Sequence, residues 1–357
     1  MSNTSLEIKE TQFAINGTPT YAGITWHGHS LEGLLFNSRM IQAIFDDENP
    51  GTRALWKYPD TGKWDAQRNT REFCASLPEY RRHGLLAVTV GLQGGGPVFT
   101  KAIYDTYMNS AFTPDGSFKP AYFDRLLQVL DASDHAGMIV IVNYFYHQQA
   151  RFFNDASVLP RVTGTVTDWL LQTGYTNIIV DIANETRVSW GHPLVDPSRV
   201  HELLGIVKGK ALHGRRLRAS TSSSGGWEIP YGKWLDAEDV SMPHGNGCSP
   251  GTLRMKIEAI REEEEYIKRP RPIIVNEDST FVENLEAAIE AGASWGFYCQ
   301  GFGSEYKDLQ DWTLHGREKT YEALSGFQTV PVNWSINTLD KKRFFDRLKV
   351  ITSGKEP

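Results

Sequence analysis

A short apolar run followed by an amphipathic stretch occurs eight times along the 357 residues of this chain. The apolar runs do not alternate between polar and apolar residues, and most are rich in Val and Ile. Such runs are typical of strands that are buried on both faces of a parallel sheet. The eight runs are TYAGITW (20–26), LLAVTVGL (85–92), MIVIVNYFY (138–146), NIIVDIA (177–183), RLRAST (216–221), DVSMP (239–243), PIIVN (272–276) and SWGFYC (294–299).

The stretches between these runs have the periodicity of helices. Residues 122–135 place apolar side chains at the i, i+3, i+4 and i+7 positions of one helix face, and 198–213 and 253–267 have a similar pattern. Glycines suited to ending helices stand before several runs, at Gly84, Gly137, Gly174 and Gly292. Eight strand–helix units favour an α/β fold of the (β/α)8 TIM barrel class.

Two long irregular segments, 47–67 and 92–118, follow the first and second runs. In a barrel these are enlarged loops after strands 1 and 2, at the face where barrels build their sites. The sequence contains no internal repeat and no low-complexity linker, so we expect one catalytic barrel domain over 1–357. Its core spans about 13–327, and a helical extension over 328–357 ends in a helix at 340–351.

Composition narrows the range of partners. A formal charge of −6 and a pI near 6.0 argue against nucleic acid or an anionic membrane as the main partner. No apolar run reaches the roughly 20 residues of a membrane span. Neither GxGxxG after the first run nor GxxxxGK[ST] is present, so no cofactor is predicted. The three cysteines and the start MSNTSLEIKE favour a cytoplasmic protein, or a secreted one whose signal peptide has been removed. Oligomeric state is left open.

Two glutamates end apolar runs in the same way. Asn184-Glu185 closes the fourth run, and Asn276-Glu277 closes the seventh. Strands 4 and 7 lie on opposite sides of a closed barrel, so both carboxylates can reach one sugar ring across its mouth. Retaining glycosidases need such a pair, one as acid/base and one as nucleophile. A glutamate after a strand can also serve only as a favourable charge at a helix N-terminus.

These motifs resemble clan A glycoside hydrolases, most closely the family 5-type (cellulase-like) barrels. The resemblance implies a retaining glycoside hydrolase acting on a carbohydrate, either an oligosaccharide, a polysaccharide or a glycoside. It implies that Glu185 is the acid/base, Glu277 is the nucleophile and Asn184 contacts the sugar 2-hydroxyl. The clan often has a histidine near the end of strand 6, where this chain has His244.

The chain departs from the clan's pattern at three strands. Asn246 stands where a tyrosine commonly holds the nucleophile, and strand 2 lacks the arginine that often stabilises it. Tyr298, with Trp295 close by, stands near the position of the usual strand-8 tryptophan. Further substrate-binding candidates at predicted strand ends are Trp26, His27 and His147, since sugar faces stack on aromatic rings and hydroxyls need polar partners.

Two rival readings remain open. His27 and His29 have the His-x-His spacing of amidohydrolase-type barrels, and His244 could be a third metal ligand. That scheme also needs a His after strand 5 and an Asp after strand 8, where the sequence has STSSSGG (220–226) and CQGFG (299–303). We therefore predict no metal site. A non-catalytic carbohydrate-binding barrel is the other alternative.

The two-carboxylate mechanism sets an electrostatic expectation. Glu277 should be ionised, and the neighbouring carboxylate should raise the pKa of Glu185 so that it can donate a proton. A bell-shaped pH–rate profile and retained anomeric configuration should follow.

Overall fold

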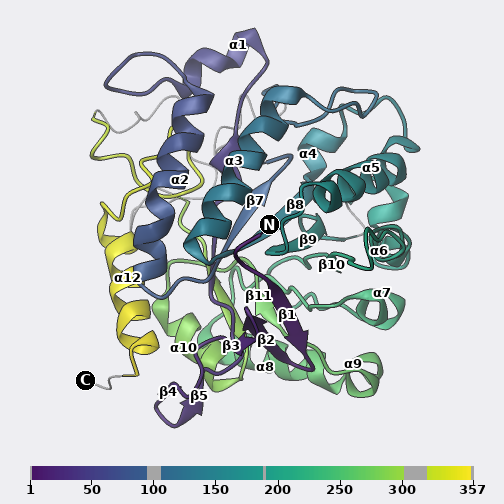
Figure 1. The fold of residues 1–357 in the computed structure, drawn as a ribbon, viewed down its shortest axis with the longest axis vertical. Coiled ribbons are helices and arrows are strands. Elements are labelled where there is room, and N and C mark those ends of the chain that lie inside the picture. Colours follow the sequence, from purple (N-terminus) through teal and green to yellow (C-terminus); the bar gives the residue numbers. More distant parts are fainter. Residues whose placement is uncertain (1, 95–105, 188–189, 301–319, 355–357) are drawn as a thin grey trace.

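The computed structural model describes residues 2–94, 106–187, 190–300 and 320–354. Seven parallel strands form one curled sheet in the order β10-β9-β8-β7-β6-β12-β11, with helices packed around it (Figure 1). The strands are β6 (Asn37–Arg39), β7 (Ala87–Gly91), β8 (Ile139–Phe145), β9 (Ile178–Ala183), β10 (Arg218–Ser220), β11 (Ile274–Val275) and β12 (Ser294–Phe297). Every residue of the longer strands β7, β8 and β9 is buried, as their apolar sequences predict.

The sixth apolar run forms single bridges rather than a ladder. Segment 241–244 lies between the two edge strands, where Met242 bridges Ser222 and Ser241 bridges Ile273, both in parallel sense. A third parallel bridge joins His244 to Glu277. This segment therefore connects the β10 side of the sheet to the β11 side.

The helices match most of the amphipathic stretches. Pro120 begins α3, and Gly137 ends it in the left-handed conformation at φ 70°. The expected helix at 253–267 is broken at Glu263, whose backbone is extended, and the expected final helix is confirmed as α12. The helices are α1 (Pro50–Arg53), α2 (Ala66–Arg82), α3 (Pro120–Ala136), α4 (His147–Ala150), α5 (Val158–Gln172), α6 (Val200–Lys208), α7 (Gly232–Ala237), α8 (Pro250–Glu262), α9 (Glu264–Lys268), α10 (Val282–Glu290) and α12 (Leu339–Thr352), with short 3-10 turns η1 (Ile41–Ile44), η2 (Ala54–Trp56) and η4 (Pro193–Val195).

A small antiparallel sheet covers the amino-terminal ends of the parallel strands. It consists of β1 (Leu6–Lys9), β2 (Gln12–Ile15) and β3 (Thr18–Pro19). Apolar side chains of β1 and β2, including Ile8, pack on the apolar cluster inside the curled sheet, which includes Ile141, Ile179 and Ile274. The opposite, carboxyl-terminal ends are left to the long connections, which is where a site can form.

The predicted first strand is wrong. Residues 20–26 do not enter the parallel sheet; Thr25–Trp26 (β4) pairs with His29–Ser30 (β5) in a hairpin at the lower edge of Figure 1. The turn between them is His27-Gly28, with φ of 47° and 81°, the two positive values that a tight hairpin turn requires. The strand at this place in the sheet is β6, eleven residues further along.

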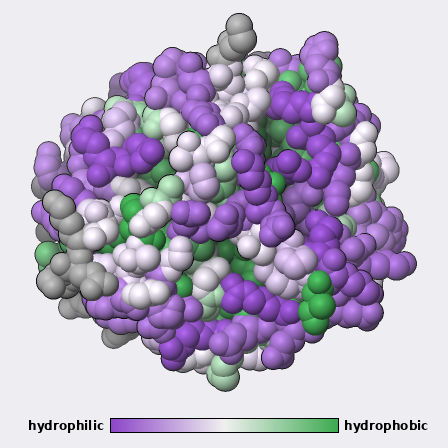
Figure 2. All heavy atoms as spheres, turned by 60° about the horizontal axis from the view of Figure 1, so that its bottom comes forward, coloured by the Kyte–Doolittle hydropathy of each residue, from purple (hydrophilic) through white to green (hydrophobic). Residues whose placement is uncertain are grey.

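The surface is largely polar on the face that Figure 2 presents, where hydrophobic residues form separate small patches. Within the described ranges, no helix combines the length and the apolar character needed to cross a membrane.

Candidate active site

Two glutamates meet at the carboxyl-terminal ends of the parallel strands. Glu185 follows β9 and Glu277 follows β11. One oxygen of each carboxylate and one ring nitrogen of His244 lie within 4.8 Å of one another. The Glu185 side chain is partly exposed and that of Glu277 is nearly buried. The two predicted carboxylates therefore share one site.

Glu277 is held by two side chains from other segments. The guanidinium Nε of Arg39 forms an ion pair with Oε2 of Glu277. The side-chain amide of Asn246 donates to Oε1 over 3.0 Å. Each oxygen of the carboxylate thus has its own donor. Asn246 contacts the Glu277 carboxylate, the group that the tyrosine expected from the resemblance would hold.

Arg39 is the functional residue that the sequence analysis missed. It ends β6. The sequence analysis assigned the first strand to 20–26 instead, so Arg39 did not stand at a predicted strand end. The signal was present in the sequence, since the apolar run Leu34–Phe36 directly precedes Asn37-Ser38-Arg39. Arg39 thus places a cation against Glu277 from β6.

A layer of buried polar side chains supports Arg39 from inside the sheet. Asp181 accepts hydrogen bonds from Asn143 at 2.9 Å and from the backbone of Ser222 at 3.0 Å. Asn276 donates to the same carboxylate at 3.4 Å. Burial raises the pKa of Asp181 to about 6, although Arg39 and its other partners work in the opposite direction. Opposite charge on two sides therefore keeps the buried guanidinium ionised.

Asn184 lies beside Glu185 and is connected to the same arginine. Its side-chain oxygen accepts a hydrogen bond from Arg39 Nη2, and its backbone oxygen accepts one from the indole of Trp190 at 3.0 Å. Glu185 itself has a positive φ of 57°, a conformation uncommon for a residue other than glycine. The backbone amide of Glu185 is fixed by Ser222 Oγ at 3.1 Å.

His244 lies between the two carboxylates and is completely buried. Its Nδ1 is 3.6 Å from Glu185 Oε1 and 3.8 Å from Glu277 Oε2. The next residue must be small, because a Cβ at Gly245 would come within 2.5 Å of the Asp278 carboxylate. This glycine lets the chain pass close to Asp278 and turn Asn246 toward Glu277.

The electrostatics of Glu185 differ from the expectation. Burial, the largest single influence, raises the pKa of Glu185, but His244, Arg187 and Arg39 together outweigh it, so that the pKa is lowered to about 2. Arg187 Nη1 lies 3.2 Å from Glu185 Oε2. The predicted raised pKa is therefore wrong for the free protein, because the sequence did not disclose how many cations surround this carboxylate.

Three further predicted residues have distinct environments. His147 begins α4 near Glu185, and burial, helped by Arg187, lowers its pKa to about 4. Tyr298 is nearly buried, and its pKa is raised by burial and then by the negative charge of Glu277, which places it by the site. Trp295 is fully buried and donates to Asp278 at 2.7 Å, so its indole belongs to the core beneath the site.

The structure places Trp26, His27 and His29 at the other end of the sheet. Their hairpin is joined to the connection before β7 by a hydrogen bond from the Tyr21 hydroxyl to the backbone oxygen of Gly84, 2.7 Å long. Trp26 is buried, while His27 and His29 are exposed there. The prediction that Trp26 and His27 line the site is therefore not supported, and the two histidines cannot share a metal ion with His244.

The residues that could hold a metal ion are Glu185, His244 and Glu277 themselves, by their mutual distances. Arg39 and Arg187 already neutralise the two carboxylates. A divalent cation would therefore bring excess positive charge into a largely buried site, which disfavours its binding.

Comparison with known proteins gives a likeness of fold. No protein-family model matches the chain, and no curated protein matches its sequence. The chain is similar to a GH5-4 broad-specificity endoglucanase from Clostridium longisporum, with a TM-score of 0.56 and 8% identity over 90% of this chain and 96% of that one. It is also similar to an endo-1,4-beta-mannanase from Rhizomucor miehei (TM-score 0.51, 10% identity, 82% and 89% covered) and to the structure of ZgEngAGH5_4 in complex with a cellotriose (0.52, 11%, 89% and 95%). The chain therefore has a fold similar to that of family 5-type, cellulase-like glycoside hydrolases.

Proposed function

We propose that this protein is a retaining glycoside hydrolase in which Glu277 is the nucleophile and Glu185 is the acid/base. The observation that carries the proposal is that one oxygen of each carboxylate lies within 4.8 Å of an oxygen of the other. Retaining enzymes keep the two carboxyl groups about 5–5.5 Å apart, whereas inverting enzymes need about 6.5–9.5 Å to admit a water molecule. The likeness to an endoglucanase, a mannanase and a cellotriose complex supports a carbohydrate substrate.

The proposed reaction proceeds in two displacements. Glu277 attacks the anomeric carbon, and Glu185 gives a proton to the leaving oxygen. Water then attacks the glycosyl–enzyme ester, with Glu185 taking up the proton that the water loses. Arg39 and Asn246 orient the attacking carboxylate. Bond formation removes the negative charge of Glu277, and the same two residues stabilise this charge when the carboxylate departs in the second step.

Other parts of the molecule fit this proposal. The bridges of segment 241–244 support a (β/α)8 barrel closed between β10 and β11. Asn184 is suited to contact a sugar hydroxyl next to the scissile bond. Trp227 lies on the connection after β10, and its side chain is 54% exposed, so its ring is available for stacking on a sugar face.

Chemical rescue with azide tests the two roles against each other. In Glu277→Ala, azide replaces the nucleophile and attacks once, so the glycosyl azide should have inverted configuration. In Glu185→Ala, azide attacks the glycosyl–enzyme, so its product should have retained configuration. Both products can be identified by proton NMR. The same configuration from both variants would contradict the assignment, and the absence of hydrolysis of any aryl glycoside by the unaltered protein would favour a binding-only barrel.

A further inference from the structure

A nitrogen atom lies beside each oxygen of the acid/base glutamate. His244 Nδ1 lies 3.6 Å from Oε1, and Arg187 Nη1 lies 3.2 Å from Oε2. A general acid needs a proton on one oxygen and free access from that oxygen to the leaving group. At least one of these two contacts must therefore open when substrate binds.

Arg187 is the contact that can open. Its side chain is 31% exposed, whereas His244 is fully buried. The Nε of Arg187 has no hydrogen-bond partner among the described residues, so the guanidinium holds Glu185 through one end only. Arg39, the other arginine here, is buried and bonded to both Glu277 and Asn184. Arg187 therefore has an unused donor, its Nε, in addition to the Nη1 that faces Glu185.

A neutral sugar hydroxyl is a weak competitor for a guanidinium that already pairs with a carboxylate. An anionic group competes on equal terms, because carboxylates and sulfates form paired hydrogen bonds with guanidinium groups. We propose that Arg187 binds an anionic group of the substrate, so that this site is built for an acidic sugar, either a uronic acid or a sulfated sugar. The proposal rests on the proposed function, since it takes Glu185 as the acid.

The charges of the site balance under this exchange. In the free protein, Glu185 and Glu277 offset Arg187 and Arg39. When the substrate anion pairs with Arg187, Glu185 loses that counter-charge and takes up one proton from solvent. This proton restores the charge balance, and Glu185 can then donate it to the leaving group. The charged and titratable groups facing Glu185 in this step are His244, Arg187, Arg39, Glu277, His147, Lys256 and Tyr298.

Calorimetry on the full chain tests this exchange without requiring turnover. The probes are D-glucuronate, D-galacturonate and glucose 6-sulfate, each compared with the neutral hexose. We expect at least one anionic probe to bind about tenfold or more tighter than its neutral counterpart. Titrations in buffers of different ionisation enthalpy should show uptake of close to one proton with that probe and none with the neutral sugar. The probe that binds distinguishes a uronic acid from a sulfated sugar.

Variants assign the effect to Arg187. Arg187→Gln should abolish both the anion preference and the proton uptake, and Arg187→Lys should keep part of each. The matched control is Arg199→Gln, because Arg199, the residue directly before α6, is an exposed arginine paired with Glu202 at 2.7 Å, and its substitution should change neither. Equal binding of anionic and neutral sugars, or a preference that survives in Arg187→Gln, would overturn the inference. Hydrolysis of aryl glycosides without any anion preference would do so while leaving the glycosidase proposal intact.

Discussion

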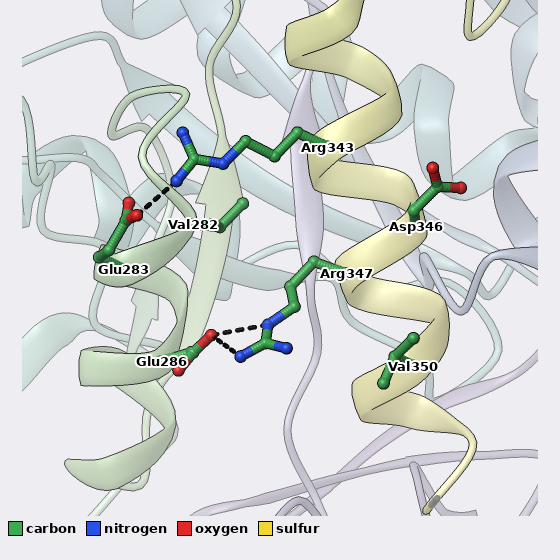
Figure 3. A pocket seen from close by; sticks show the side chains of 7 residues that line it. All are labelled: Val282, Glu283, Glu286, Arg343, Asp346, Arg347 and Val350. Atoms are coloured by element: carbon green, nitrogen blue, oxygen red, sulfur yellow. Dashed lines mark hydrogen bonds and ion pairs between the residues drawn. The ribbon is translucent and has the colours of Figure 1, made fainter. Parts of the chain in front are cut away.

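Two arginine–glutamate pairs in this molecule have the same chemistry and different surroundings. Arg39 and Glu277 meet at the candidate site, with side chains 2% and 9% exposed. Arg347 of α12 and Glu286 of α10 meet across a surface groove, with side chains 32% and 29% exposed, and a second pair, Arg343 and Glu283, lies beside them (Figure 3).

The difference between the two pairs concerns what happens when one partner is removed. At the groove, water and salt replace the lost partner, so such pairs contribute roughly 0–1 kcal/mol. At the site, water cannot reach the remaining charge, and removal of one partner from a buried pair costs about 3–5 kcal/mol. The buried pair is therefore the one whose disruption should be felt in both stability and activity.

The largest effect is expected from Arg39→Met. The substitution leaves the Glu277 carboxylate buried with only Asn246 as a donor, so the free energy of unfolding should fall by about 3–5 kcal/mol at neutral pH. Urea denaturation measures this loss. Arg39→Lys keeps the charge but not both contacts and should lose less. A loss below about 1 kcal/mol for Arg39→Met would show that the pair behaves like a surface pair.

The double variant Arg39→Met/Glu277→Leu sharpens the same comparison. Removing both charges should recover part of the stability lost in Arg39→Met, because Glu277 no longer leaves an unpaired charge, while the buried Asp181 still lacks Arg39. Hydrolysis should nevertheless be absent, since the nucleophile is gone. Denaturation and activity assays on the single and double variants complete the cycle. Stability that falls further in the double variant would mean that the two charges stabilise the site independently.

A smaller effect is expected at the edge of the site, where Arg187 is partly exposed. In Arg187→Gln the pKa of Glu185 should rise, because one of the cations that stabilise its carboxylate is removed while Arg39 and His244 stay. Glu185 then remains protonated to higher pH. The alkaline limb of kcat/KM for a neutral aryl glycoside should move up by roughly one pH unit. An unchanged or lowered limb would argue against Glu185 as the acid.

The smallest effect is expected at the groove. Arg347→Gln should lower the free energy of unfolding by at most about 1 kcal/mol, and the loss should shrink when salt is added. Activity should stay the same, since α12 packs on the outside of the sheet (Figure 1). Denaturation of Arg347→Gln and Glu286→Gln, with and without sodium chloride, tests this. A loss as large as that of Arg39→Met would remove the distinction between the two regions.

Sequence reasoning found the parts of the fold that depend on continuous apolar runs. The runs at 85–92, 138–146 and 177–183 became β7, β8 and β9, because a strand buried on both faces has few polar residues to obscure it. The first strand was misassigned because β6 has only three residues, all polar, whereas 20–26 is apolar and belongs to a hairpin. The His27-Gly28 turn was the signal that 20–26 belongs to a hairpin.

The sequence predicted the site residues that are recognised by their type and their place after a strand. It did not predict the properties that depend on contacts across the sheet. Glu185, His244 and Glu277 follow the fourth, sixth and seventh apolar runs, and the structure brings them together. Arg39 depended on the misassigned strand. The lowered pKa of Glu185 depends on where Arg187 and His244 come to lie, and no spacing in the sequence determines that.

The most direct test of the central claim is covalent trapping with 2-deoxy-2-fluoro glycosides that carry a dinitrophenolate leaving group. Such a leaving group departs without a proton, so trapping reports on the nucleophile alone. We predict one sugar per chain by intact mass, located on the peptide that contains Glu277. The label should be absent in Glu277→Gln and still form in Glu185→Gln. A label on another residue, or hydrolysis with inverted configuration and no label, would contradict the account.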